Sequence, residues 1–365
     1  MTEQLLPWLK GRRTVILLGA GGVGKTTSSI VLALLAAKQG RKVGLLSIDP
    51  AKRLAAALGI PLSSQLRRLN LPAELQITGT VDAAMLDQKA VFDTLVRRHA
   101  PSDQAAEKIL NDKIYKAVSG NLSGPLEYLA LAKLQELSED SRYDFVILDT
   151  PPDTHALDFL ARPGLLHGFV ENRVMTWMIK PFLYAGKLGF AKFLSAGEKL
   201  MGGVAKLTGV DALRSFAEFL VLMQEVIEGL NESGNRMKRL LTRQDTGFVL
   251  VTIPTRSAGR SAVNIAKQLV AMGHRAHFAI VNKCLPEELV KALKADEEAT
   301  PLSGVTVLKA RAKGEHDVIR DLYNAIQAGV IRVKEQDQDL GTLSGLMELA
   351  GDLEAATVDL YSGDA

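Results

Sequence analysis

Short runs of hydrophobic residues recur along the 365-residue chain, each bounded by turn or helix signals. Most of the runs are continuously apolar rather than alternating, and they are rich in β-branched residues. This pattern predicts strands that are buried on both faces of a parallel sheet. We expect these strands at residues 14–18, 42–47, 75–81, 144–150, 247–253, 277–282 and 305–308.

Helical patterns lie between the predicted strands. In the segment TSSIVLALLAAKQG, for example, the apolar run ends at Gly40, a typical residue just beyond a helix C-terminus. Strands that alternate with helices predict an α/β fold with a doubly wound, mostly parallel sheet of about seven or eight strands. Ligands of such sheets bind at the carboxyl ends of the strands.

Two stretches depart from this alternation and predict a helical subdomain. Residues 82–138 read as helical without a convincing strand, and residues 164–243 are helix-like and rich in Met, Phe and Leu. We expect 164–243 to be inserted into a core of residues 1–163 and 244–365, with 82–138 contributing helices to the insertion. A last amphipathic helix is expected within 343–361.

Composition narrows the class of protein. Hydrophobic residues make up 47% and charged residues 23%, as in ordinary soluble globular proteins. The net charge of +3 is too small to indicate nucleic acid as a partner, so none is expected. No secretion signal is visible, and the longest apolar run, residues 30–37, is far shorter than the ~20 residues of a spanning helix. The one cysteine, Cys284, excludes a disulfide framework and favours the cytoplasm.

The strongest chemical signal is GAGGVGKT at residues 19–26, which satisfies the motif G-x-x-x-x-G-K-[ST] between a predicted strand and a predicted helix. Its glycines let backbone N–H groups face phosphates, and the helix N-terminus adds positive potential. Lys25 is expected to neutralise the β- and γ-phosphates, and the Thr26 hydroxyl to ligate Mg²⁺. The residues expected to bind the nucleotide in this segment are Gly21, Gly22, Val23, Gly24, Lys25, Thr26 and Thr27.

Two aspartates follow predicted strands. Asp149 ends the apolar run of DFVILDTPP, where its carboxylate would join the magnesium site, although an aspartate that caps the next helix would look similar. Asp49 follows the strand at 42–47 and is expected to orient the attacking water, because an isolated aspartate with a pKa of about 4 is a poor proton acceptor. Asp49 could equally be a helix N-cap before Pro50, and one residue can do both.

Together these segments resemble a known family. GAGGVGKTT, SIDPAKRL and DTPPDTHALDFLARPGLL look like the phosphate loop and the two switch segments of the arsenite-pump and tail-anchored-protein-targeting ATPases. These are dimeric P-loop NTPases with a deviant Walker A motif. GNLSGPLEYLALAKL (120–134) and AIVNKCLPEE (279–288) extend the resemblance, which runs from about residue 14 to residue 325.

The resemblance implies several roles. ATP would be the nucleotide, Asp49 and Lys25 would be catalytic, and Asn282 would contact the adenine, although Asn282 could also cap a loop. The second switch, residues 149–155, would report the γ-phosphate to the helical insertion, with His155 as a structural switch residue. The chain would act as a homodimer.

The chain departs from the family's pattern at one position of the loop. The residue after the first glycine of the loop is typically a lysine that reaches the partner's nucleotide, and here it is Ala20. Since an added positive charge stabilises the transition state of phosphoryl transfer, the loss places dimer closure and turnover in question, but not nucleotide binding. Lys52 or Arg53 could deliver a substitute charge, or both could be solvated surface residues.

A second departure concerns the cargo. A trivalent arsenical needs several thiolates, so a single cysteine argues against an arsenite pump subunit. Residues 169–207 carry Met, Phe and Trp among basic residues, which is typical of either an ordinary core or a groove for an apolar helix, a membrane-protein client or a membrane surface.

Two classes of function follow. The first is an ATPase whose hydrolysis of ATP gates an apolar client site. The second is an ATP-binding interaction or scaffold module with little hydrolysis, which Ala20 keeps open. A biosynthetic ligase or kinase on the same fold would need an acceptor pocket, and the sequence has no motif for one.

Overall fold

The computed structural model describes residues 5–48, 53–59, 63, 65–119, 126–151, 210–295, 304–336 and 342–355. The described chain divides into two compact units. The first takes in residues 5–86, 133–151 and 239–355, and the second takes in residues 87–132 and 210–238, each with the gaps just given. Most of the predicted insertion, 164–243, lies outside the described residues, so its boundaries stay a prediction.

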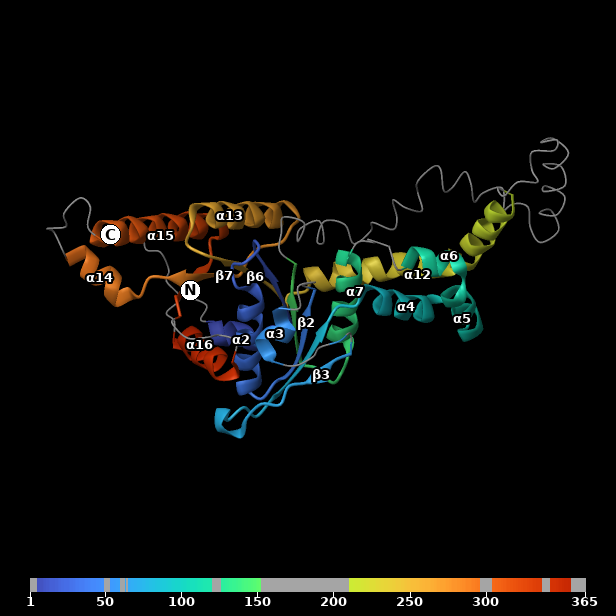
Figure 1. Ribbon diagram of the computed structural model, residues 1–365, viewed down its shortest axis with the longest axis horizontal. Helices are drawn as coiled ribbons and strands as arrows, with labels where there is room; N and C mark the ends of the chain where they lie inside the picture. Colours follow the sequence, from blue (N-terminus) through green and yellow to red (C-terminus); the bar gives the residue numbers. More distant parts are fainter. Residues whose placement is uncertain are drawn as a thin grey trace. The chain divides into compact units, whose positions relative to one another are not determined.

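The first unit is built on an eight-stranded sheet of order β3-β4-β2-β5-β1-β6-β7-β8 (Figure 1). All neighbouring strands are parallel except β3 and β4, which pair antiparallel. The predicted α/β fold with a mostly parallel sheet is therefore confirmed. The strands are β1 (Thr14–Leu18), β2 (Lys42–Ser47), β3 (Arg67–Arg68), β4 (Thr80–Met85), β5 (Phe145–Asp149), β6 (Thr246–Thr252), β7 (Phe278–Cys284) and β8 (Gly329–Lys334).

Helices cover both faces of this sheet. Helix α2 (Lys25–Lys38) packs against β1, β2, β4 and β5, and α16 (Leu343–Ala355) packs on α2. Helices α13 (Arg256–Ala271) and α15 (Gly304–Ile326) pack on one another over β6, β7 and β8, on the other face (Figure 1). This unit also contains α1 (Leu5–Lys10), α3 (Arg53–Leu58), α14 (Glu287–Ala295), the second part of α7 (Leu126–Glu139) and the end of α12 (Val210–Thr242).

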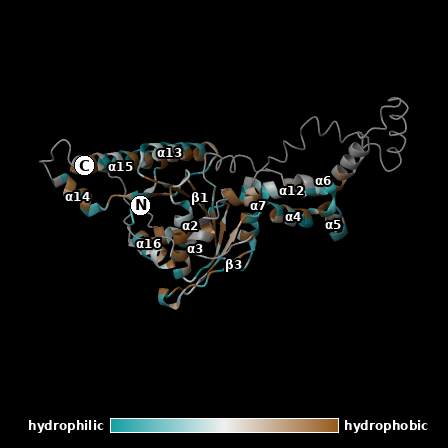
Figure 2. Cartoon of the chain, viewed as in Figure 1, coloured by the Kyte–Doolittle hydropathy of each residue, from teal (hydrophilic) through white to brown (hydrophobic). Residues whose placement is uncertain are grey.

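Burial explains why the central strands are continuously apolar. Every residue of β1, β5 and β6 is buried, because helices cover both faces of the sheet. Helix α2 is buried almost all round between the sheet and α16, which is why its sequence is apolar on every side. Helix α13, by contrast, buries one face and exposes the other, and its ribbon alternates between hydrophobic and hydrophilic in Figure 2.

Three sequence expectations need correction. The strand expected at 75–81 is β4, which begins only at Thr80 and runs to Met85, so the helical assignment of 82–85 was wrong. Residues Ala73–Leu75 form a 3₁₀ turn instead. The run VTVL at 305–308 is not a strand but the first turns of α15, and Val307 is 69% exposed. A four-residue β-branched run cannot be told from a helix end by periodicity, and here the packing of α15 overrides the propensity of its residues.

Strand β4 was misplaced, and the outermost strands β3 and β8 were missed, because these strands are less apolar than the central ones. In β4, Asp82 faces the sheet edge, where its carboxylate accepts a hydrogen bond from the Tyr143 hydroxyl (2.9 Å) and pairs with Arg68 of β3. Strand β8 contains Arg332, so GVIRVK breaks the continuous apolar pattern. The expected C-terminal helix is confirmed as α16, which buries Leu346, Leu349 and Leu353.

The second unit is helical. It contains α4 (Gln88–His99), α5 (Asp103–Asn111), α6 (Lys113–Ser119), the first part of α7 (Leu126–Glu139) and most of α12 (Val210–Thr242). The Tyr128 hydroxyl donates to the carbonyl of Leu230 (2.6 Å), and the His99 ring packs on Gly229 beside the Ser233 hydroxyl (3.1 Å). Among the helices that the structure describes, none combines the length with the hydropathy that a membrane span requires.

A half-buried histidine, His277, joins the first helix to the sheet. The Phe248 N–H donates to Nδ1 of His277 (3.2 Å), and the His277 ring lies 5.6 Å from the ring of Trp8 in α1. Burial, together with the charges of Arg12 and Arg275, lowers the pKa of His277 to about 4. The folded protein therefore holds this ring neutral at pH values where the unfolded chain protonates it.

We expect acid to destabilise the protein through His277. The pKa rises from about 4 in the folded state to about 6.5 in the unfolded chain, so the unfolded state binds more protons between these values. The contribution of His277 to the free energy of unfolding is then fully present above about pH 6.5, and it is lost as the pH falls toward 4. Urea unfolding across this range should show a smaller decline for His277→Asn, because the asparagine oxygen can accept from Phe248 without titrating. The exposed His316 provides the control, and a slope that responds equally to His316→Asn would contradict the assignment.

Candidate nucleotide site

The phosphate-loop motif lies between β1 and α2, as its sequence context predicts. Gly24 occupies the N-cap of α2 with a left-handed φ of 94°, and Gly22 also has a positive φ of 75°. A side chain at Gly19 would collide with the carbonyl oxygen of Val251 at the end of β6. The glycines therefore allow a tight loop that fits against the neighbouring strand, and Gly21 and Gly22 are exposed.

Lys25 is the first residue of α2, and its ammonium lies over the loop. Only 6% of the residue is exposed, and Nζ donates to the carbonyl oxygens of Gly19 and Ala20, both at 2.9 Å. These bonds point the ammonium toward the start of the loop. A positive charge in this position can exchange such carbonyls for phosphate oxygens, which bind it more strongly.

Asp149 joins the ends of three elements. Its carboxylate is fully buried at the end of β5, and Oδ2 accepts from the hydroxyls of Thr26 in α2 and Ser47 in β2, both at 2.8 Å. A buried carboxylate requires such donors, since its desolvation is costly. Ser47, opposite Asp149 in the β2–β5 register, was missed in the sequence, although its position at a strand end two residues before Asp49 was an available signal.

The Thr26 hydroxyl and the Asp149 carboxylate fit a magnesium ion in their chemistry. Both are hard oxygen donors, which Mg²⁺ prefers, and they lie within hydrogen-bond distance of one another. In the described ranges, no group of three or more His, Cys, Asp or Glu side chains could hold a metal ion. A cation here would take its remaining ligands from phosphate and water, as Mg²⁺ does in phosphate-binding proteins.

Asn282 reaches the loop from the other side. It lies near the end of β7, and its amide nitrogen donates to the carbonyl of Val23 (2.8 Å) and to the Ser28 hydroxyl (3.4 Å). A Cβ added to Gly24 would lie 2.5 Å from this nitrogen. Asn282 therefore braces the phosphate loop, in line with the alternative that it caps a loop. Its contact with adenine stays a prediction.

Comparison with known proteins identifies the family. A family model described as anion-transporting ATPase matches residues 12–300, well over half of the chain. The chain belongs to the anion-transporting ATPase family. The predicted family resemblance is therefore confirmed, and by its family the protein is an ATPase and binds ATP.

Individual relatives of this anion-transporting ATPase are distant but cover most of the chain. It is 25% identical over 352 residues to ATPase ASNA1 homolog 1 of Paramecium tetraurelia, covering 92% of this chain and 93% of the relative. It is 25% identical over 282 residues to ATPase GET3 of Kluyveromyces lactis, covering 75% and 72%. It is also 25% identical over 295 residues to a protein named as arsenical pump-driving ATPase 2 in Aquifex aeolicus, covering 77% and 84%.

Several predicted residues of the anion-transporting ATPase lie outside the described residues. These include Asp49, Lys52, His155 and the Met-rich segment 169–207, and the side chain of Arg53 is likewise not described. The residue after strand β2 is described: the Ile48 N–H donates to the carbonyl of Asp149 (3.0 Å). Thr27, the last predicted loop residue, is half-buried in the first turn of α2.

The single cysteine of the ATPase is poorly suited to bind a soft metal. Cys284 is 1% exposed, and its thiol donates to the carbonyl of Val281 (3.2 Å). Burial and the nearby Glu315 raise the pKa of this thiol to about 11. Metal binding requires the thiolate, so at neutral pH this thiol is in the wrong protonation state.

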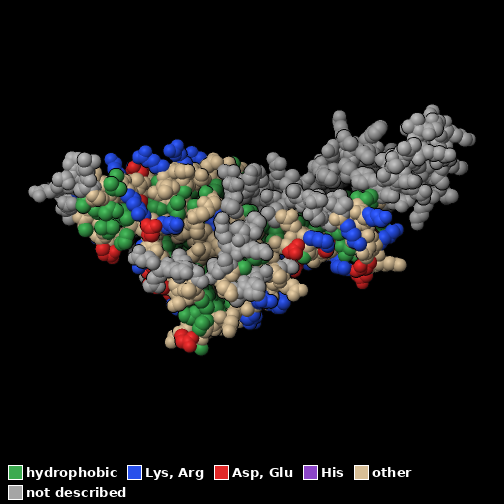
Figure 3. All heavy atoms as spheres, viewed as in Figure 1, with side chains coloured by type: hydrophobic (Ala, Val, Ile, Leu, Met, Phe, Trp, Pro, Cys, Tyr) green, Lys and Arg blue, Asp and Glu red, His purple; other side chains and the backbone are tan. Residues whose placement is uncertain are grey.

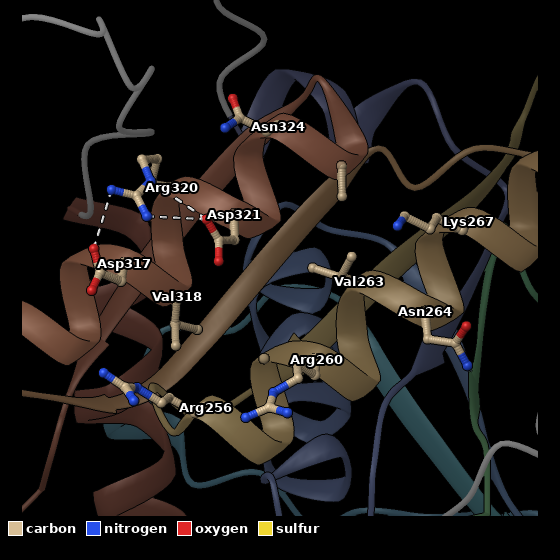
Figure 4. Close-up of a pocket in the computed structure, with 12 residues that line it drawn as sticks. Arg256, Arg260, Val263, Asn264, Lys267, Asp317, Val318, Arg320, Asp321 and Asn324 are labelled. Atoms are coloured by element: carbon tan, nitrogen blue, oxygen red, sulfur yellow. Dashed lines mark hydrogen bonds and ion pairs between the residues drawn. The ribbon is translucent and has the colours of Figure 1, made fainter.

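A concave surface of the ATPase lies between α13 and α15, with a volume of about 800 Å³ (Figure 4). Basic side chains gather over these helices in Figure 3. On the α15 side, Arg320 pairs with Asp317 (3.1 Å) and Asp321 (3.3 Å). No loop residue lines this groove, and neither does Asp149 or Asn282, so the groove is separate from the nucleotide site.

We expect Lys25→Met to weaken ATP binding by about 100-fold, because hydrogen bonds to a charged group contribute about 1.5–3 kcal/mol each. The dissociation constant can be measured by isothermal titration calorimetry. Lys38→Met is a matched control, since Lys38 lies at the other end of the same helix and forms an exposed ion pair with Glu354. Unchanged ATP affinity in folded Lys25→Met would refute the loop assignment.

Proposed function

We propose that this ATPase is a Mg²⁺-dependent switch protein that works as a homodimer and couples ATP hydrolysis to the binding of an apolar client. The observation that carries the proposal is the hydrogen bond from the Thr26 hydroxyl to the Asp149 carboxylate (2.8 Å). It lies beside the loop whose carbonyl oxygens accept from Lys25. This combination offers one fixed cation and one pair of magnesium ligands at the same phosphate loop.

The chain's own residues divide the work of phosphoryl transfer. The loop N–H groups and Lys25 bind and orient the β- and γ-phosphates, and the fixed positive charge offsets the negative charge that spreads over the γ-phosphate oxygens. Thr26 and Asp149 would hold Mg²⁺, which would supply positive charge to offset the negative charge of the phosphates. Asp49 orients the attacking water through its carboxylate. Asn282 contacts the adenine and fixes the loop.

The client would bind to the helical subdomain, for which we propose residues 164–243 with helices from 82–138. The support is the Met- and Phe-rich composition of 169–207, since methionine-rich surfaces adapt to varied apolar partners. A hydrophobic helix of a membrane protein, or a membrane surface, has the matching chemistry. Arsenite is an unsuitable cargo, because Cys284 is the one cysteine of the chain and is buried as a neutral thiol. We infer a cytoplasmic site of action from the same sparing use of cysteine.

A second candidate function is an ATP-binding scaffold with little hydrolysis. Ala20 favours it, because this position carries no charge that could reach a partner's nucleotide. Turnover distinguishes the two candidates.

We expect ATP turnover per chain to rise with protein concentration, because hydrolysis in a homodimer requires that two chains pair. The measurement is phosphate release over a hundredfold range of protein concentration. Asp49→Asn is the blank and should lose hydrolysis while it retains ATP affinity. A low rate that is independent of concentration, with ATP still tightly bound, would favour the scaffold instead. Turnover of Asp49→Asn at the rate of the unmodified chain would remove Asp49 from the mechanism.

We expect Asp149→Asn to lose most of the gain in ATP affinity that Mg²⁺ provides. The neutral amide keeps the shape of the carboxylate but attracts a divalent cation far less strongly. Titrations of ATP with and without Mg²⁺ should give a Mg²⁺ effect that is at least about tenfold smaller in the variant. Asp144→Asn, just before the same strand, removes the ion pair between the exposed Asp144 and the half-buried Arg41 and serves as control. An equal Mg²⁺ effect in Asp149→Asn and in the unmodified chain would exclude Asp149 as a ligand.

A further inference from the structure

The end of β7 is irregular where it meets the phosphate loop. Val281 pairs with Arg332 of β8 and Cys284 pairs with Lys334, so β7 has one extra residue over this interval. Lys283, next to Asn282, has a left-handed φ of 60°. A bulge of this kind redirects the neighbouring side chain, and a lysine in this conformation persists only where the surroundings hold it.

Two residues of α15 hold this bulge. Glu315 is 1% exposed, and its two carboxylate oxygens accept from the Leu285 N–H at 3.0 and 3.2 Å. Arg311, one turn earlier, donates through Nε to Glu315 (3.1 Å) and through an outer guanidinium nitrogen to the carbonyl of Lys283 (3.1 Å). The pair therefore binds the backbone on both sides of Cys284.

Charges around the pair complete the network. Arg311 also bonds to Glu335 (2.8 Å), whose side chain is 50% exposed, and Arg332 lies 3.9 Å from Glu315. The Glu335 N–H donates to the carbonyl of Cys284 (2.9 Å). Arg311 is the residue that connects the buried carboxylate to the left-handed turn, because its planar fork reaches both at once.

The bulge in turn sets the position of Asn282. Its amide nitrogen bonds to the carbonyl of Val23 at 2.8 Å and lies 2.5 Å from the point where a Cβ on Gly24 would stand. Arg311 and Glu315 are thus connected to the phosphate loop in steps. The two residues bond to the bulge, the bulge adjoins Asn282, and Asn282 bonds to the loop backbone.

We propose that Arg311 and Glu315 are positioning residues of the nucleotide site, which set nucleotide affinity by holding Asn282 against the phosphate loop. The inference rests on the proposed nucleotide site and goes beyond it, because neither residue belongs to the motif or lines the loop. It also gives α15 a mechanical connection to the bound nucleotide.

The test is a double-mutant cycle on Mg²⁺–ADP affinity, measured by calorimetry with the full chain. Arg311→Lys keeps the charge but loses the fork, and should weaken Mg²⁺–ADP binding by about three- to tenfold, the effect of one or two hydrogen bonds. Asn282→Ala should weaken binding at least as much. In the Asn282→Ala background, Arg311→Lys should change affinity by less than about twofold, since the two act through one contact.

Two variants are matched controls. Arg320→Lys lies on the same helix and affects exposed ion pairs with Asp317 and Asp321, and Glu335→Gln removes only the exposed partner of Arg311. Both should leave the Mg²⁺–ADP affinity within twofold of the unmodified chain. Should Arg311→Lys fail to fold, Glu315→Gln keeps the volume and an acceptor for Leu285 and carries the same expectation.

The outcomes separate this proposal from the ATPase proposal. Folded Arg311→Lys with unchanged Mg²⁺–ADP affinity but a lower melting temperature would overturn the positioning role and make the pair purely structural. The positioning role would also be overturned if Arg311→Lys weakened Mg²⁺–ADP binding by the same factor with and without Asn282→Ala. A chain that gives the expected cycle for Mg²⁺–ADP but never hydrolyses ATP would contradict the ATPase switch alone and support the positioning role.

Discussion

The buried carboxylate of Asp149 is the constraint on which the nucleotide site depends. A charged group with no exposure needs hydrogen-bond donors, and here Oδ2 accepts from the hydroxyls of Thr26 and Ser47. Each hydroxyl comes from a different element, so one carboxylate fixes the start of α2 and the end of β2 relative to the end of β5. The carboxyl ends of the central strands are thereby held together at the point where a parallel sheet binds its ligand.

The phosphate loop is held from its other side by packing and by amide hydrogen bonds rather than by charge. Gly19 lies against the carbonyl of Val251, so the loop can follow β6 only because no side chain intervenes. Asn282 then bonds to the carbonyl of Val23 and presses on Gly24. The glycines of the motif therefore serve two purposes: they expose N–H groups to phosphate, and they admit the strands that brace the loop.

Strands that a run of neighbouring residues encodes could be predicted from the sequence, and hydrogen bonds between residues far apart in the sequence could not. Strands β1, β2, β5, β6 and β7 were found to within two residues, because burial on both faces leaves a continuous apolar run. Strand β8 was missed and 305–308 was taken for a strand, since a short run carries no periodicity. Ser47 and Asp149 are 102 positions apart, and Asn282 and Val23 are 259 apart, so their pairing depends on strand order and on a bulge, which no local pattern encodes.

At position 20, the shape of the loop depends on the backbone, whereas its charge depends on the side chain. Ala20 is half-buried against the apolar core, and its contribution to the loop is a backbone carbonyl that accepts from Lys25. Any residue at this position would supply the same carbonyl, so the shape of the loop does not depend on the side chain there. The difference from the lysine of the resembling ATPases is therefore one of charge alone. Because the backbone cannot restore that charge, a substitute must come from another side chain or the reaction must proceed without it.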